Sequence, residues 1–459
     1  MSLDLRHPLP GRRPLVAGGA RSGVAAARLL ARHGAEVRIC DKSPREALPE
    51  AARELETQGI DCAWGRDDAG LLEGRDFVVW SPGIPCDHPL ATAARARGLE
   101  VLGELELGFM ASRAPLIAIT GTNGKSTTTD LIGALLRAAG REAEVCGNIG
   151  RPICEVAEHV SATGLLVVEV SSFQLETVRR LKPWIATWLN LTPDHGDRHG
   201  TFDAYGAAKQ RLFEHQDMDD WAVFTADDPE VAMRRTGQAG RIGFSRERAL
   251  DEGAFLENGE LVLAWRGGRE PLLPRRELRL PGPHNVSNAL AALATLLPLE
   301  LPRDTLREVL RTYGGLEHRL EPAGEVGGVR FVNDSKATNA GSMEVALQSF
   351  EQPVVLIAGG RDKGQDFRPL APLVRRSVRH LVLIGEGAEA MARAWTGVTS
   401  ERAGSLAEAV SAAARAAGPG GLVLLSPGCS SFDMFRDYED RGRRFKDEVR
   451  RLGQGGAVA

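Results

Sequence analysis

Short runs of uninterrupted apolar residues recur along this chain and alternate with longer Ala-, Leu- and Arg-rich stretches of helical period. A strand that is apolar throughout fits a sheet covered on both faces, the usual setting of parallel strands joined by crossover helices. The pattern therefore predicts an α/β fold. The predicted strands are residues 14–17, 37–40, 77–80, 116–120, 165–170, 185–189, 354–358, 381–384 and 422–425.

The length of the chain and its Gly-rich turns predict several domains. At 459 residues it exceeds the roughly 250–300 residues at which a single core stops growing. A strand followed by a Gly-rich turn occurs near Gly18, again near Gly121 and again near Gly359. These three units predict three domains, and the turn-rich region 251–279 predicts hairpins inserted in the central one.

The charge balance and the cysteines restrict the partners and the compartment. There are 57 Lys and Arg against 61 Asp and Glu, a net charge of -4, which favours neither nucleic acid nor an anionic membrane as a partner. The six cysteines include no C-x-x-C pair, which argues against a zinc site or a disulfide framework and fits a reducing compartment. No apolar run approaches the roughly 18 residues of a membrane span, and residues 1–11 lack the apolar segment of a leader. We expect a soluble, cytoplasmic protein that acts on small molecules.

The segment that carries the most chemistry is residues 119–127, Ile-Thr-Gly-Thr-Asn-Gly-Lys-Ser-Thr, between an apolar strand and a helix expected to start near Thr128. In such a loop, backbone N–H groups hold phosphate oxygens, Lys125 places a positive charge on the β- and γ-phosphates, and the Ser126 hydroxyl can ligate Mg²⁺. The loop is shorter than the common G-x-x-x-x-G-K-[ST] pattern. The alternative is an ordinary Gly-rich turn with a solvated lysine, and the combination of features favours ATP.

The first Gly-rich turn, residues 18–23, carries a weaker signal. It keeps the outer glycines of G-x-G-x-x-G but has Ala20 in place of the second, and Asp41 ends the next strand where an acidic residue binds ribose. Residues 81–83, Ser-Pro-Gly, add a second loop at the same sheet edge. Three interpretations of this turn remain open. It binds a dinucleotide, it binds the nucleotide-diphosphate part of a substrate, or it has a purely structural role.

Further polar residues follow the strands of the predicted central sheet. Glu169, with Ser171 and Ser172 after it, ends one strand, and a carboxylate beside a phosphate loop is a credible Mg²⁺ ligand. The loop 190–199 carries His195 and His199, for which metal ligation and ordinary hydrogen bonding are equally good interpretations.

Three more segments have a structural and a functional interpretation. Lys209, taken alone, reads as a solvated helix lysine. Asn285 and Asn288 precede an Ala/Leu-rich helix, where they could cap the helix or contact a base or ribose. The third domain begins with two segments rich in charged residues, 317–319 and 333–339. Their charge density is high enough for them to lie against a phosphate group.

Taken in order, these motifs resemble the Mur ligases of peptidoglycan precursor synthesis over nearly the whole chain. Residues 121–127 match an ATP loop that this family shares with the folylpolyglutamate synthases. Residues 169–176, 333–339 and 426–433 narrow the resemblance to the glutamate-adding members, since the arginine-centred motif of the diaminopimelate- and lysine-adding enzymes is missing.

The resemblance implies a domain plan and a set of site residues. It implies a Rossmann-like N-terminal domain for a UDP-substrate (1–103), a central P-loop mononucleotide-binding ATPase domain (104–314), and a Rossmann-like C-terminal domain for an amino acid (315–459). The implied ATP-binding residues are Gly121, Thr122, Asn123, Gly124, Lys125, Ser126, Thr127, Asn285, Arg319 and Asp334. The implied UDP-substrate contacts are Gly18, Arg21, Ser22, Asp41, Ser81, Gly83, Asn148, Ser171 and His195. The implied amino-acid pocket is Lys336, Thr338, Lys363, Ser431 and Phe432.

The resemblance also implies the chemistry. Two Mg²⁺ ions would be held by Ser126, Glu169, His195 and an N-carbamylated Lys209, and the catalytic set would be Lys125, Glu169, His195, Lys209 and Lys336. The substrates would be ATP, UDP-N-acetylmuramoyl-L-alanine and D-glutamate, joined through an acyl phosphate by a monomer whose third domain closes on the central one. The identities of the pocket residues do not by themselves show whether the pocket prefers D- or L-glutamate. A folylpolyglutamate synthase, a nucleotide-sensing protein without turnover and an NAD-dependent dehydrogenase are the competing hypotheses.

Overall fold

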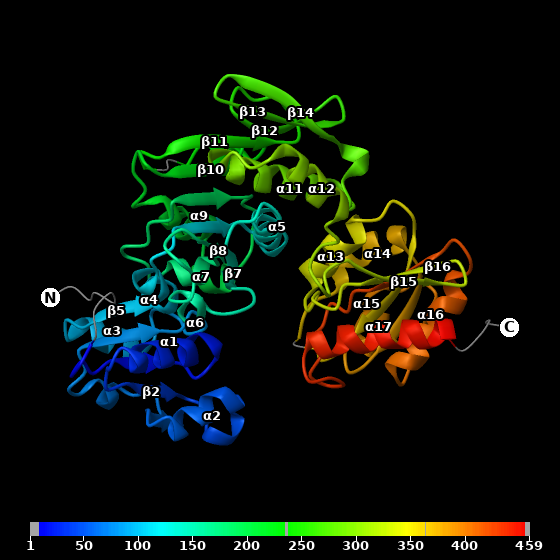
Figure 1. Cartoon of the computed structure of the whole chain (residues 1–459). Coiled ribbons are helices and arrows are strands. Elements are labelled where there is room, and N and C mark those ends of the chain that lie inside the picture. The colour runs from blue at the N-terminus through cyan, green and yellow to red at the C-terminus, as the bar shows by residue number, and fades with distance from the viewer. Residues whose placement is uncertain (1–8, 235–236, 363, 455–459) are drawn as a thin grey trace. The chain divides into compact units, whose positions relative to one another are not determined.

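The computed structural model describes residues 9–234, 237–362 and 364–454, and within them three β-sheets (Figure 1). By their contacts the described residues form two compact units, 9–278 with 284–312 and 279–283 with 313–454. The first unit holds two of the sheets and the second unit holds the third. The α/β class predicted from the apolar runs is confirmed.

The first sheet is parallel throughout, in the strand order β3-β2-β1-β4-β5. Its strands are β1 (Leu15–Ala17), β2 (Arg38–Asp41), β3 (Asp61–Trp64), β4 (Phe77–Trp80) and β5 (Glu100–Gly103). Its helices are α1 (Arg21–Arg32), α2 (Glu50–Thr57) and α3 (Pro89–Ala96). Val16 and Val79 pack on the face shared with α1, whereas Leu15 and Val78 pack on the face shared with α3, so both faces are covered as predicted.

The second sheet has nine strands in the order β14-β13-β12-β11-β10-β9-β6-β8-β7. The strands are β6 (Leu116–Thr120), β7 (Ala143–Gly147), β8 (Leu165–Glu169), β9 (Ile185–Trp188), β10 (Trp221–Thr225), β11 (Gly240–Ser245), β12 (Gly253–Glu257), β13 (Glu260–Trp265) and β14 (Gly268–Pro274). The helices are α4 (Glu104–Ala111), α5 (Lys125–Ala138), α6 (Ile153–Val156), α7 (Ser172–Leu175), α8 (Gly196–His199), α9 (Phe202–Gln210), α10 (Pro229–Ala232), α11 (Pro283–Leu296) and α12 (Arg303–Thr312). The predicted hairpins exist as β12 to β14, but they extend the sheet at its edge rather than forming a separate insertion.

The helix α4 fixes the first sheet to the second within the same unit. One continuous core of buried residues runs from Val16 and Leu30 through Leu105 and Leu107 on α4 to Val168. The approach of α4 to α6 is so close that a Cβ at Gly108 would lie 2.4 Å from Ile153 Cγ2. The predicted division between residues 103 and 104 therefore falls inside one compact unit, and the domain boundaries stay a prediction.

The third sheet has the order β15-β16-β20-β17-β18-β19, antiparallel only at β15 and β16. Its strands are β15 (Glu321–Val326), β16 (Val329–Asn333), β17 (Val354–Gly359), β18 (Val378–Ile384), β19 (Ser400–Arg402) and β20 (Leu422–Leu425). Its helices are α13 (Ala340–Gln348), α14 (Ala371–Ser377), α15 (Ala388–Ala394), α16 (Leu406–Ala417) and α17 (Tyr438–Gln454). One face packs on Met343 and Met391, the other on Val410 and Phe445, so this sheet is also covered on both sides.

No helix in the described part of the chain combines the length and the apolar character that a bilayer crossing requires.

Candidate active site

The loop between β6 and α5 has the backbone that its glycines predict. Gly124 has φ +82°, and a Cβ there would lie 2.3 Å from Asn288 Oδ1, so a larger residue would be both strained and obstructed. Gly124 is also the N-cap of α5, which therefore begins at Lys125 rather than near Thr128 as the sequence suggested. The earlier start brings the N-terminus of a long helix, with its unpaired N–H groups, directly to the loop.

A side chain that the sequence analysis did not select, Asn190, holds this loop in place. Its Oδ1 accepts hydrogen bonds from the backbone N–H groups of Thr122 (3.1 Å) and Asn123 (2.8 Å), and its Nδ2 donates to Asn123 O (3.0 Å). Two of the loop N–H groups predicted to hold phosphate are thus bound to Asn190. The only available signal was its position, directly after Leu189 at the end of β9, which pairs with β6.

The predicted metal ligand Glu169 ends β8, next to β6, and is 1% exposed. Its Oε1 accepts a 2.7 Å hydrogen bond from Asn148 Nδ2, whereas its Oε2 is buried without a hydrogen-bond partner. Leaving a buried carboxylate oxygen unpaired costs about 1–3 kcal/mol or more, so such an atom calls for a ligand. No local sequence pattern indicated that Asn148, predicted as a substrate contact, would orient Glu169.

Lys209 lies on α9 and is not the solvated helix lysine that its spacing alone suggests, since it is only 1% exposed. Its Nζ donates to Gly121 O (2.8 Å) and lies 4.5 Å from the centre of the Tyr205 ring. Burial, reinforced by the nearby Lys125 ammonium, lowers the pKa of Lys209 well below its usual value, although Asp194 and Glu169 oppose that shift. The structure therefore brings Lys125, Glu169 and Lys209 together at the carboxyl edge of the central sheet.

The two histidines of the loop 190–199 have different environments. His195 is the N-cap of α8 with φ +50°, a left-handed conformation that costs a non-glycine residue roughly 1–2 kcal/mol, and its side chain is 43% exposed. Its ring packs 4.7 Å from the ring of Phe173. His199 is largely buried instead, with Nε2 3.0 Å from Ser172 Oγ, and burial lowers its pKa. The ordinary hydrogen-bonding interpretation thus suits His199, whereas the more exposed His195 ring has its Nε2 3.5 Å from Asp194 Oδ2.

Asn285 and Asn288 do not cap a helix, because α11 begins at Pro283 and both side chains are buried within it. Asn288 Nδ2 donates to Asn285 Oδ1 (3.0 Å), and Asn288 Oδ1 lies against the Gly124 turn of the phosphate loop. The capping interpretation is wrong, and the pair is placed beside the nucleotide loop. Ser126 and Thr127, at the start of α5, are also buried.

The Gly-rich turn of the first sheet is shaped by close contacts. A Cβ at Gly23 would lie 1.8 Å from Gly18 O, so only glycine fits there. Asp41 supports the turn, its Oδ2 accepting from Gly19 N (2.7 Å) and its Oδ1 from Ser43 N (2.8 Å). Ser81, at the end of β4, lies against Gly18, and its hydroxyl is buried without a hydrogen-bond partner. The turn and the Ser81 loop therefore form one polar edge.

Other predicted substrate contacts have structural partners of their own. Arg21 donates from Nη1 to Gly150 O (3.1 Å) on the loop that follows Asn148. Ser171 is the N-cap of α7 and forms a capping box with Gln174. Ser22 lies in the first turn of α1 and is half-buried, whereas Gly83 lies on the loop after β4 and is exposed.

In the second unit, the predicted residues gather around the ends of β16 and β20. Asp334 accepts hydrogen bonds from Ser426 Oγ (2.8 Å) and Leu320 N (3.2 Å), and burial raises its pKa to about 7 although Arg319 opposes the shift. Lys336 Nζ lies 6.0 Å from the centre of the Tyr438 ring. Thr338 is half-buried, Ser431 is buried and Phe432 is 58% exposed, whereas Lys363 lies outside the described residues.

A buried arginine that the sequence analysis missed joins these loops. Arg441, on α17, is fully buried and donates to Ser335 Oγ (2.9 Å), to Ser335 O (2.8 Å) and to Cys429 O (3.1 Å). It therefore fixes the segment that carries Lys336 relative to the segment that carries Ser431. An arginine in a long charged helix gives no sequence signal of such a role.

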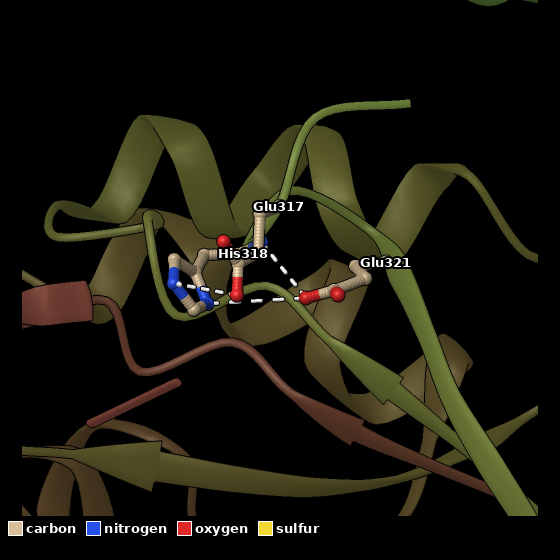
Figure 2. A group of neighbouring side chains, drawn as sticks. All are labelled: Glu317, His318 and Glu321. Atoms are coloured by element: carbon tan, nitrogen blue, oxygen red, sulfur yellow. Dashed lines mark hydrogen bonds and ion pairs between the residues drawn. The ribbon is translucent and has the colours of Figure 1, made fainter. Parts of the chain in front are cut away.

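Glu317, His318 and Glu321 form the one group of at least three metal-ligand side chains found in the described residues (Figure 2). Lys446 Nζ already bridges the two carboxylates, at 2.6 Å from Glu317 Oε1 and 2.8 Å from Glu321 Oε1. His318 Nδ1 is 3.0 Å from Asn333 Nδ2 and so accepts from it. The ammonium of Lys446 already pairs with both carboxylates, and we assign no metal to the group.

The fold and the sites together define an α/β nucleotide-binding protein, in which a phosphate loop, a buried carboxylate with one unpaired oxygen and a buried lysine share one sheet edge. Family models match the chain in three consecutive segments, described as a MurD-like Mur ligase N-terminal domain (residues 12–103), the Mur ligase middle domain (119–296) and the Mur ligase glutamate ligase domain (318–429). The chain belongs to the Mur ligase family.

Full-length relatives agree with these matches. The chain is 46% identical to the UDP-N-acetylmuramoylalanine–D-glutamate ligase of Geobacter metallireducens, over 97% of this chain and 99% of that protein. It is 45% identical to the ligase of the same name from Trichlorobacter lovleyi, over 96% and 99%. Among solved structures, the UDP-N-acetylmuramate-alanine ligase MurC of Thermotoga maritima matches with a TM-score of 0.59 at 19% identity, over 97% of this chain and 100% of that one, which shows a common fold.

Proposed function

We propose that this protein is an ATP-dependent amide ligase that adds D-glutamate to UDP-N-acetylmuramoyl-L-alanine through an acyl phosphate. The full-length relatives, at 40–46% identity, carry the name of that ligase. The observation in the structure that carries the proposal is the unpartnered Oε2 of Glu169, buried beside the phosphate loop and Lys209. ATP, the UDP-substrate and glutamate are its small-molecule partners.

The central residues suit the two Mg²⁺ ions that the family implies. Glu169 has a free carboxylate oxygen, His195 an accessible ring, and Ser126 a hydroxyl at the start of α5. Glu169 and Ser126 would supply the oxygen donors that Mg²⁺ prefers, whereas His195 would add a nitrogen donor. When bound, these ions would offset the repulsion between the triphosphate and an incoming carboxylate.

Lys209 joins this set only as a carbamate. An ammonium cannot ligate a cation, but the neutral amine can attack the carbon of CO₂, forming an N–C bond and releasing a proton to leave a carbamate with two oxygens. The lowered pKa of Lys209 favours that neutral amine. Carbamylation would also replace one of two neighbouring positive charges with a negative one.

The reaction follows from charge and geometry. An oxygen of the L-alanyl carboxylate attacks the γ-phosphorus of ATP, and the bond to the β,γ-bridging oxygen breaks to release ADP. Lys125 stabilises the negative charge that gathers on the transferring group. The amine of glutamate then attacks the acyl carbon, a C–N bond forms, the C–O bond to phosphate breaks, and the amine loses its proton.

The remaining site residues complete the proposal. Gly18, Arg21, Ser22, Asp41, Ser81 and Gly83 hold the UDP group, with Asn148 and Ser171 nearer the reacting carboxylate. Asn285, Arg319 and Asp334 contact ATP beyond its phosphates. Lys336, Thr338, Lys363, Ser431 and Phe432 form the amino-acid pocket, since a substrate with two carboxylates favours cations and hydroxyls.

The same proposal places the protein in the cytoplasm as a monomer without nucleic-acid or membrane partners. The described cysteines are all free, and the net charge of -4 provides no basic surface for a polyanion.

A phosphate-release assay tests the proposed function. With ATP, Mg²⁺ and UDP-N-acetylmuramoyl-L-alanine, we expect phosphate to appear only when D-glutamate is added, with little or none for L-glutamate or other amino acids. Release with a folate acceptor instead would indicate a folylpolyglutamate synthase. Binding of both nucleotides without any acceptor-dependent release would indicate a sensor rather than a ligase.

A further inference from the structure

Arg198 joins two segments that the proposed function uses separately. It lies on α8, three residues after His195. Its Nη2 donates to Ile84 O (3.1 Å) and Pro82 O (3.5 Å), on the loop that starts at Ser81 in the first sheet. One side chain therefore spans from the segment that presents His195 to the loop proposed to hold the UDP group.

The guanidinium is fixed on its other sides as well. Its Nε donates to Glu176 Oε1 (3.0 Å), its Nη2 donates to Glu176 Oε2, and its carbon lies 4.9 Å from the centre of the Phe173 ring. The side chain is only 12% exposed, and the bonds to Glu176 raise its pKa, so its charge is permanent. Phe173 is also the ring against which His195 packs. A displacement of Arg198 would therefore reach His195 through α8 and through Phe173.

A purely structural ion pair would not need the bonds to the first sheet. Arg211 provides the comparison, because it donates to Glu176 O (2.8 Å) and Val178 O and thus stays within the central sheet's own segments. Of these two arginines, only Arg198 donates hydrogen bonds to the Ser81 loop. Backbone carbonyls on a loop move with the loop, so a ligand that shifted the Ser81 loop would also shift Arg198.

We infer that Arg198 is a positioning residue that couples occupancy of the Ser81 loop to the placement of His195 for metal binding. The inference rests on the proposed function, because it takes the Ser81 loop as a UDP site and His195 as a metal ligand. By linkage, UDP at the loop tightens metal binding, and bound metal tightens UDP binding by the same factor. The guanidinium is suited to this role because its several donors can hold Glu176 and the loop carbonyls at once.

The test uses UDP alone as the probe, because UDP lacks the sugar and the alanyl carboxylate. Its diphosphate binds Mn²⁺ in solution, so the free Mn²⁺ concentration is calibrated with UDP in the absence of protein. Mn²⁺ binding is followed by electron paramagnetic resonance with a β,γ-imido analogue of ATP, with and without UDP. In the parent protein we expect UDP to raise the Mn²⁺ affinity at least about 5-fold. Calorimetry of UDP binding with and without Mn²⁺ should give the same factor.

The variants are Arg198→Lys, Arg198→Gln and the matched control Arg211→Lys. A lysine at position 198 can keep the charge pairing with Glu176 but cannot also hold the two loop carbonyls, so it should fold and yet lose the coupling. Arg198→Gln should lose it too, whereas Arg211→Lys should retain it. Coupling in Arg198→Lys equal to that of the parent, or UDP binding to the parent without any coupling, would overturn the role of Arg198. Failure of the parent to bind UDP at all would instead contradict the proposed function.

Discussion

Two lysines share one backbone carbonyl in the phosphate loop that follows β6. Lys125 Nζ and Lys209 Nζ lie 2.9 and 2.8 Å from Gly121 O, and Lys209 is almost fully buried. Two ammonium groups held this close repel each other, and the buried one more readily gives up its proton. The lowered pKa of Lys209 is the residue-scale property on which its proposed carbamylation depends.

Replacement of Lys209 should therefore remove both a covalent group and most activity. In protein equilibrated with ¹³C-bicarbonate, we expect a carbamate signal by nuclear magnetic resonance that is absent from Lys209→Arg, whose turnover should fall by about 100-fold or more. Lys182, an ion-pair partner of Asp217, provides the control, because Lys182→Arg should keep the signal. A Lys209→Arg protein as active as the parent would refute the assignment.

Asn190 illustrates what sequence reasoning could not reach at this scale. Its three hydrogen bonds to the phosphate loop depend on the pairing of β9 with β6, which no local pattern encodes. Arg441 was missed for the same reason, since its partners lie 12 and 106 residues away along the chain. Lys125 and Glu169, by contrast, were selected from the phosphate loop and from the end of a predicted strand, whereas Lys209 was selected only through the family resemblance, since its spacing alone indicated a solvated lysine.

Removal of the Asn190 side chain should loosen the loop that grips ATP. Asn190→Ala removes the side-chain acceptor of the Thr122 and Asn123 N–H groups, and only Thr122 keeps a bond, to the backbone Asn190 O (3.1 Å), so part of the loop must be ordered by the nucleotide itself. We expect calorimetry to show that ATP binds about 10-fold more weakly, because that loss of affinity corresponds to roughly the free energy of one hydrogen bond to a buried group. Asn190→Asp keeps the acceptor and should bind ATP more tightly than the alanine variant. Equal affinities in the parent and Asn190→Ala would exclude this role.

At the scale of elements, α4 is a buried connection held by two carboxylates. Glu104 Oε1 accepts from Cys154 N (2.8 Å) at α6, and Glu106 accepts from the backbone N–H groups of Arg179 (3.1 Å) and Arg180 (2.7 Å). Burial raises the pKa of Glu104 to about 7, and its Oε2 has no hydrogen-bond partner. The first sheet is therefore fixed to the second through a group that is expensive to ionise.

This raised pKa makes stability depend on pH in a defined direction. Between about pH 4.5 and 7 the folded protein binds more protons at Glu104 than the unfolded chain does, so this residue's contribution to the free energy of unfolding falls as pH rises. Glu104→Gln cannot ionise and should gain stability relative to the parent between pH 5 and pH 8, by up to about 3 kcal/mol. Urea unfolding at both pH values measures this gain, with exposed Glu73→Gln as the control. If the free energies of unfolding of the parent and Glu104→Gln differ by the same amount at pH 5 and at pH 8, Glu104 does not have this role.

The elements themselves were largely predictable. Residues 77–80, 116–120 and 422–425 match their strands in full, because short apolar runs that end at turn residues fit a strand of a covered sheet better than a longer buried helix. The start of α5 was placed three residues late, because Gly124 serves both the loop and the helix cap. The helix α11 starts before Asn285, since Pro283 suits a first helical position.

At the scale of the whole molecule, the chain places the proposed ATP loop and the proposed amino-acid pocket in different compact units. The sequence could predict three domains from its three Gly-rich openings, but not that the first two sheets share one core through α4. A reaction between ligands of separate units requires the units to meet. We expect the small-angle scattering profile to change when ATP analogue, UDP-N-acetylmuramoyl-L-alanine and D-glutamate are all present, and identical profiles would count against closure.

The most direct test of the account follows the oxygen that receives the phosphoryl group. UDP-N-acetylmuramoyl-L-alanine labelled with ¹⁸O in its alanyl carboxylate is turned over with ATP and D-glutamate, and the released phosphate is examined by mass spectrometry. Because the acyl C–O bond breaks in the second step, each phosphate should carry one ¹⁸O from the carboxylate. Phosphate without the label would mean that ATP is hydrolysed by water, and the proposed transfer at Lys125 would be wrong.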